Sequence, residues 1–107
     1  MWICLNDSFL SIVAHRDEPD SLLVRARLEG HLEAIFPGVD VARTPDADFA
    51  FRAVVPREVV AEAIRRRVAD IAYPNFKASV HSQALHDAYM AFWTVMHSLQ
   101  RQLLARP

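Results

Sequence analysis

Three arginines fall in segments whose residue pattern is typical of β-strands: Arg25, Arg27 and Arg52. Residues 21–27 alternate between apolar and polar, so Arg25 and Arg27 share one strand face. Arg52 falls on the polar side of residues 49–55. On the opposite side of this segment, we expect Phe49 and the other apolar side chains to face a core. If both strands join one sheet, the three guanidiniums converge. The guanidinium fork suits phosphate and carboxylate, so the pattern predicts a site for a phosphate, a nucleic-acid backbone or an acidic protein surface.

Two neighbours bear on this arginine hypothesis. Ser11 and His15 lie in a further strand-like segment and are positioned to join the arginines. The alternative is an ordinary solvated sheet face, on which the arginines pair with nearby carboxylates, namely Glu29, Asp46 or Asp48. Both interpretations place the same three arginines on a sheet, and they differ in whether acidic partners neutralise them.

A second group lies in residues 73–77, Tyr-Pro-Asn-Phe-Lys, where the proline interrupts helical structure. A loop bent by proline offers an amide from Asn75 and an ammonium from Lys77, and we include both among the predicted anion- or partner-binding residues. The alternative is structural: Tyr73 and Phe76 fill a core while Asn75 caps a turn.

A third group lies on a long helix expected over residues 81–104. Flanking its apolar stripe are four side chains that we predict to form an interface: Tyr89, Met90, Trp93 and His97. Aromatic residues and methionine are enriched in interface cores, so this helix favours a homodimer or a protein partner. The alternative is that all of them belong to an intramolecular core. We expect that core to include the stripe Leu85, Ala88, Phe92, Met96, Leu99 and Leu103.

Catalysis and metal binding have little support in the sequence. The imidazoles of His15 and His31 are possible acid–base groups, but no nucleophile accompanies either. Cys4 is the only cysteine, and the helical histidines do not have the spacing of a pair that binds one metal: His81, His86 and His97. We therefore expect no metal and no cofactor. A non-catalytic binding or regulatory module is therefore the favoured function. The alternatives are a small enzyme acting on a phosphorylated or nucleic-acid substrate through His15 or His31, and an inhibitor that occludes another protein's surface.

The order of elements predicts an α+β fold. Apolar alternation indicates strands, and apolar residues at helical spacing indicate helices. We expect one domain over residues 1–107, with an antiparallel sheet of four to five strands packed on one face by about three helices, the last of them long. The strands are expected at 2–5, 9–15, 21–27, 39–43 and 49–55, and the helices at 28–36, 57–71 and 81–104.

Composition excludes several classes of protein. The chain has 107 residues, of which 52% are hydrophobic, and a net charge of −1. That balance lacks the basic excess of a dedicated nucleic-acid binder, so nucleic acid is possible but not supported as a partner. No signal peptide opens the chain and no apolar stretch reaches the roughly 20 residues that span a bilayer. We therefore expect a cytoplasmic protein that does not associate with membranes.

The chain also resembles a family of small single-domain bacterial proteins of unassigned function. The resemblance runs from Met1 to Gln100, and one difference is that the family has tyrosine where this chain has Phe49. It implies a single-domain bacterial protein and no particular activity. The similarity rests on the opening Met1-Trp2, residues 9–13, Val24-Arg25-Ala26-Arg27, residues 30–33, residues 48–52, Val55-Pro56, residues 73–77, and Trp93, Met96 and Leu99-Gln100.

Overall fold

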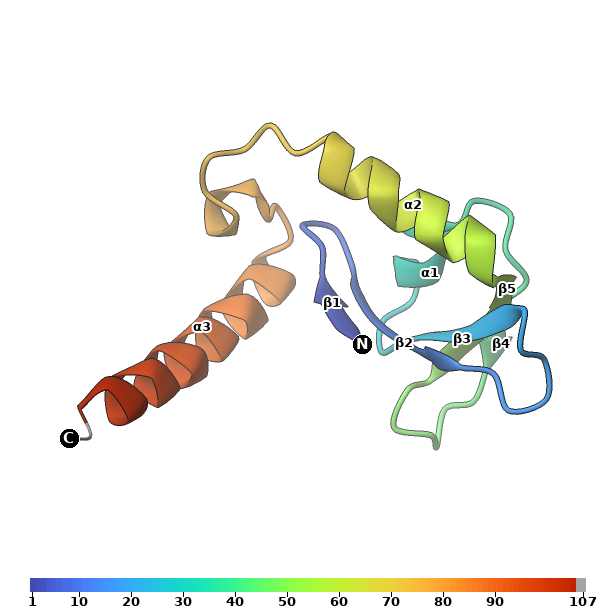
Figure 1. The fold of residues 1–107 in the computed structure, drawn as a ribbon, viewed down its shortest axis with the longest axis horizontal. Helices are drawn as coiled ribbons and strands as arrows, with labels where there is room; N and C mark the ends of the chain where they lie inside the picture. Colours follow the sequence, from blue (N-terminus) through green and yellow to red (C-terminus); the bar gives the residue numbers. More distant parts are fainter. Residues whose placement is uncertain (106–107) are drawn as a thin grey trace. The chain divides into compact units, whose positions relative to one another are not determined.

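A computed structural model describes residues 1–105 of the chain, which divides into two compact units, Met1–Ala72 and Tyr73–Pro107 (Figure 1). No linker-type sequence separates the two units. The single domain expected over residues 1–107 stays a prediction.

The first unit is built on a five-stranded antiparallel sheet with the strand order β1-β2-β3-β5-β4. Together with three α-helices, of which the C-terminal one is long, this sheet confirms the predicted α+β class. The segment at residues 2–14 forms a hairpin between its first two strands. The strands are β1 (Trp2–Cys4), β2 (Phe9–Ala14), β3 (Ser21–Ala26), β4 (Ala42–Arg43) and β5 (Phe51–Pro56).

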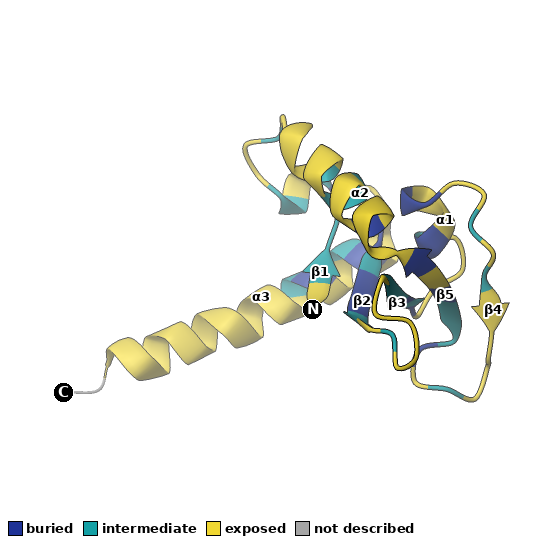
Figure 2. Ribbon diagram, turned by 45° about the vertical axis from the view of Figure 1, so that its right-hand side comes forward, coloured by how far each residue is buried: buried dark blue, intermediate teal, exposed yellow. Residues whose placement is uncertain are grey.

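One face of the sheet forms the core of this unit together with α1 (His31–Ile35) and α2 (Arg57–Ala69) (Figures 1 and 2). Full burial of a single leucine or valine is worth about 1.5–3 kcal/mol. The alternation of β2, β3 and β5 therefore fixes which side of each strand faces the helices. The core residues are Leu10, Ile12, Val24, Ala26, Leu32, Ile35, Phe36, Ala53, Val55 and Val60.

Two predicted elements are shorter than expected. The helix predicted from residue 28 begins at His31, because Gly30 adopts a left-handed backbone with φ of 88° and acts as the N-cap. The strand predicted over 39–43 is limited to Ala42–Arg43. In both places turn geometry overrides the periodicity of the apolar residues.

Helix α2 follows Pro56 directly and is attached to two strand connections. At its start, the Arg57 side chain donates to the carbonyl of Pro19 (3.1 and 3.3 Å). Near its end, Arg67 donates to the carboxylate of Asp7 at 2.7 Å, in the β1–β2 turn. Apolar residues at helical spacing predict one buried stripe along this segment, formed by Val60, Ile64, Val68 and Ile71. Only Val60 is buried and Ile64 half-buried, whereas Val68 and Ile71 are exposed.

The second unit contains the short 3-10 helix η1 (Lys77–Ser79) and α3 (Gln83–Leu104). The hydroxyl of Ser82 caps α3 by accepting from the backbone N–H of Leu85 at 3.3 Å. Leu85 and Tyr89 are buried, and the ring of Tyr89 packs on Phe76 with 5.5 Å between ring centroids. No helix among the described residues is long and apolar enough to cross a membrane.

The core stripe predicted along α3 is wrong beyond its first residue. Leu85 is buried, but the later positions are exposed, and the helix is exposed along most of its length (Figure 2). The reason is that periodicity shows that one side of a helix is apolar without showing what covers it. The exposed members of the predicted stripe are Ala88, Phe92, Met96, Leu99 and Leu103.

Candidate functional site

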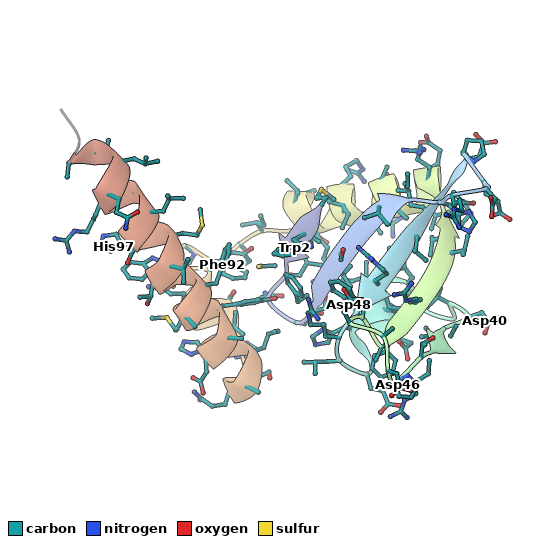
Figure 3. The ribbon with its side chains drawn as sticks, turned by 90° about the horizontal axis from the view of Figure 1, so that it is seen from below. Trp2, Asp40, Asp46, Asp48, Phe92 and His97 are labelled. Atoms are coloured by element: carbon teal, nitrogen blue, oxygen red, sulfur yellow. The ribbon has the colours of Figure 1, made fainter. Side chains whose placement is uncertain are left out.

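The strand register brings two of the predicted arginines into direct opposition. Arg25 on β3 pairs with Arg52 on β5, and Ser11 on β2 pairs with Arg25 from the other side. Directly paired residues share a sheet face, so these three side chains form a row across the face opposite the α1–α2 core. Trp2, which pairs with Ser11, extends the row onto β1. Figure 3 shows this side of the molecule, with Trp2 on β1 and Asp48 beside the sheet.

Phe49 holds two of the guanidiniums. The guanidinium carbon of Arg25 lies 4.6 Å from the centroid of the Phe49 ring, and that of Arg27 lies 4.1 Å from it. The prediction that Phe49 faces the core with Phe51 is therefore wrong, although the residue is buried, with 3% of its surface exposed. Strand β5 begins only at Phe51, and the preceding bend carries Phe49 to the arginines. We call Arg25, Arg27, Arg52, Phe49 and Ser11 the arginine face.

Hydrogen bonds link the arginine face to the bend at Asp48 and to β2. Nη2 of Arg25 donates to Oγ of the fully buried Ser11 at 2.8 Å. Nη1 of Arg27 donates to the backbone carbonyl of Asp48 at 2.6 Å, and Nε of Arg52 donates to that of Phe49 at 3.3 Å. These bonds are made to neutral oxygens, so they orient the guanidiniums without neutralising them.

Carboxylates neutralise the arginine face only in part. Of the three acidic partners considered, only Asp48 forms an ion pair with it among residues 1–105, at 3.7 Å from Nη2 of Arg52. Three positive charges thus meet one carboxylate, whose side chain is 70% exposed. In addition, Nε of Arg25 is buried without a hydrogen-bond partner. Each guanidinium has five N–H donors, so the face keeps unused capacity to bind an anion.

The predicted acid–base histidines are both engaged with backbone. Nδ1 of His15 accepts from the N–H groups of Asp17 and Glu18, both at 3.1 Å, so His15 orders the turn after β2. Nδ1 of His31 accepts from the N–H of Phe9 at 3.1 Å. Burial lowers the pKa of His31 below its ordinary value, which favours the neutral imidazole that accepts from Phe9.

The second predicted group lies in the Tyr73–Pro107 unit. Oδ1 of Asn75 accepts from the backbone N–H of Ala78 at 3.0 Å, which is a capping interaction. Nζ of Lys77 lies 4.8 Å from the centroid of a Trp93 ring, so its ammonium makes a cation–π contact. Tyr73 and Phe76 pack edge to face. These contacts give both residues structural roles, and their predicted role in binding stays a prediction.

The four predicted interface residues divide into buried and exposed members. Tyr89 is buried and Met90 is half-buried. Trp93 is 47% exposed and stacks on His97, with 4.8 Å between centroids and 17° between planes. Phe92, which was assigned to the core stripe, is 51% exposed and leaves α3 on a different side from His97 (Figure 3).

Two exposed apolar residues lie on the arginine side of the sheet and were not among the predicted site residues. Trp2 is 68% exposed at one end of the row, and Val54 is 48% exposed two residues beyond Arg52. The alternation of β1 and β5 contained the signal that these residues share a face with the arginines. Among residues 1–105, no three His, Cys, Asp or Glu side chains gather into a metal-binding group.

A shallow groove of about 720 Å³ lies elsewhere in the first unit, between α2 and residues 35–39. Its lining includes the apolar Val39, Val59 and Ala63 together with the charged Glu58 and Arg66. None of the three arginines of the arginine face lines this groove, and its lining does not indicate a particular ligand.

Comparison with known proteins adds no relative to this description: no family model matches the chain, and no curated protein or solved structure is significantly similar to it.

Proposed function

We propose that the protein is a non-catalytic binding module whose arginine face binds an acidic segment of a partner protein. The observation that carries the proposal is the direct opposition of Arg25 and Arg52 on adjacent strands. Like charges placed opposite each other destabilise a sheet, and among the described residues Asp48 forms an ion pair with Arg52 but not with Arg25. A bound carboxylate removes that repulsion, which makes binding favourable at this position.

Two features favour an acidic protein segment over other anions. Trp2 and Val54 are exposed on the same side of the sheet, and tryptophan and arginine are the residue types that dominate protein–protein hot spots. The chain's net charge of −1 is unfavourable for a nucleic-acid backbone, whose binding depends on a basic excess. An extended acidic peptide fits this surface, because its carboxylates suit the guanidiniums and its apolar side chains suit Trp2 and Val54.

Isothermal titration with a hexaglutamate peptide tests the proposal at low and at moderate salt. We expect binding that weakens as salt increases, and at least a tenfold loss of affinity in Arg25→Met and in Arg27→Met. Arg16→Met is the matched control, since it removes the same charge from the β2–β3 connection, away from the arginine face, and we expect a change below twofold. Circular dichroism verifies that each variant is folded.

Inorganic phosphate and a twelve-nucleotide single strand are the competing ligands. No binding of hexaglutamate by the wild-type chain, or equal loss in Arg16→Met, overturns the proposal. Tighter binding of the oligonucleotide or of phosphate than of the peptide also overturns it, in favour of a nucleic-acid or phosphate site.

A further inference from the structure

The large apolar side chains of α3 follow a heptad pattern. Successive members are separated by four, three, four, three and four residues, which is the a/d spacing of helices that pair along a seam. The alternation of four-residue and three-residue steps keeps these side chains in one stripe along the helix. The seam consists of Leu85, Tyr89, Phe92, Met96, Leu99 and Leu103.

The seam is covered at its beginning and exposed over the rest of the helix. Leu85 and Tyr89 are buried, whereas the four later side chains are 43–55% exposed. Trp93 and Val95, which flank the seam, are 47% and 65% exposed. At roughly 100 Å² each, these six exposed side chains present on the order of 600 Å² per chain, close to the roughly 800 Å² per partner of a standard interface.

The charges of α3 lie away from the seam. Its only Asp, Glu, Lys or Arg residues are Asp87 and Arg101, and both occupy the heptad position opposite the seam. The positions that flank the seam are uncharged. In coiled coils, charged residues at these positions select a different partner helix. Two copies of this helix therefore meet without repulsion between like charges, and a strongly charged partner helix gains nothing here.

We propose that α3 pairs with α3 of a second copy of the chain, through Phe92, Met96, Leu99 and Leu103. A seam that is apolar, uncharged at its flanks and regular in its spacing is complementary to itself. The sheet of the first unit already has its apolar face covered by α1 and α2, so that face is occupied. This pairing does not depend on what the arginine face binds.

Sedimentation velocity of the full chain between about 1 and 500 μM tests the pairing. We expect the weight-average mass to rise toward that of a dimer with concentration, with little dependence on salt. Met96→Lys places a charge in the seam and weakens association at least tenfold. Thr94→Lys introduces the same charge at the position opposite the seam, where Thr94 is exposed, and leaves the association within twofold.

Leu103→Lys is a second seam variant, placed near the end of α3, where a lysine does not disturb the capped start of the helix. A wild-type chain that stays monomeric at 500 μM overturns the proposal. A dimer that survives both Met96→Lys and Leu103→Lys, or that Thr94→Lys dissociates equally, overturns it too, because the contact then lies on another surface. Hexaglutamate binding by the monomeric variants separates this outcome from the function proposed for the arginine face.

Discussion

The Phe49 ring organises the arginine face by contacting two guanidiniums at once. Cation–π contacts are worth about 0.5–1 kcal/mol at exposed sites and more where the groups are desolvated. Because the ring is buried, it restrains Arg25 and Arg27 before any ligand arrives. Less side-chain entropy is then lost on binding, and this preorganisation increases affinity.

A double-mutant cycle measures the contribution of this ring. We expect the variants Phe49→Leu, Arg27→Met and their combination to show a coupling free energy of about 0.5–1 kcal/mol in urea denaturation. The control cycle replaces Arg27→Met with Arg16→Met and is expected to give a coupling near zero. Equal coupling in the two cycles contradicts a specific contact between Phe49 and Arg27.

His31 makes the stability of the first unit depend on pH. Burial lowers its pKa in the folded chain below the ordinary value of 6.5. Between the folded pKa and 6.5, the unfolded chain binds more protons than the folded chain, so the free energy of unfolding falls as the pH is lowered from 7 toward 5. Protonation of Nδ1 also removes the acceptor for the N–H of Phe9.

Denaturation of the wild type and of His31→Asn at several pH values checks this assignment. Asparagine does not titrate, and its side-chain oxygen provides an acceptor for the N–H of Phe9. We expect the decrease in unfolding free energy between pH 7 and 5 to be smaller in His31→Asn than in the wild type. An identical decrease in both proteins assigns the pH dependence to other groups.

The strands were the most predictable elements. Alternation identified β2, β3 and β5 within about two residues, and it placed Arg25 and Arg52 on the polar side of the sheet. The register that sets them directly opposite each other depends on the turns between strands, and alternation alone does not determine it. The convergence of the arginines was therefore a sequence inference, whereas their pairing was visible only in the structure.

The bend before β5 shows where alternation fails. Counted backward from Phe51, Phe49 falls on the core face, but the chain leaves the strand before reaching it. Asp48 is part of the reason, since its carboxylate accepts from the backbone N–H of Phe49 at 2.9 Å in a local turn. The turn-forming composition of residues 44–48 signals a bend without indicating where it ends.

The length of helix α3 was predicted from the sequence, but its packing was predicted only in part. Its end at Leu104 agrees with the sequence, and its start at Gln83 follows from the Ser82 cap. The apolar stripe was assigned to the core, because apolar spacing is the same for a buried face and for an exposed one. Burial separates the two cases, and it depends on the tertiary structure.

For the whole molecule, a net charge of −1 conceals an uneven distribution. The arginine face carries three guanidiniums against one carboxylate, while α3 is uncharged along its seam. If α3 pairs as proposed, the dimer has two arginine faces. Two linked sites bind a surface of clustered ligands more tightly than one site does, because the second binding step becomes intramolecular.

This coupling predicts different behaviour toward clustered and isolated ligands. On a surface densely coated with hexaglutamate, we expect the wild-type chain to dissociate at least tenfold more slowly than the Met96→Lys monomer, as measured by surface plasmon resonance. The advantage disappears on a sparsely coated surface, and titration with free hexaglutamate gives both proteins the same dissociation constant per chain. Thr94→Lys, which keeps the seam intact, is expected to match the wild type on both surfaces. Equal dissociation of wild type and Met96→Lys from the dense surface, with a dimer shown by sedimentation, contradicts simultaneous use of the two arginine faces.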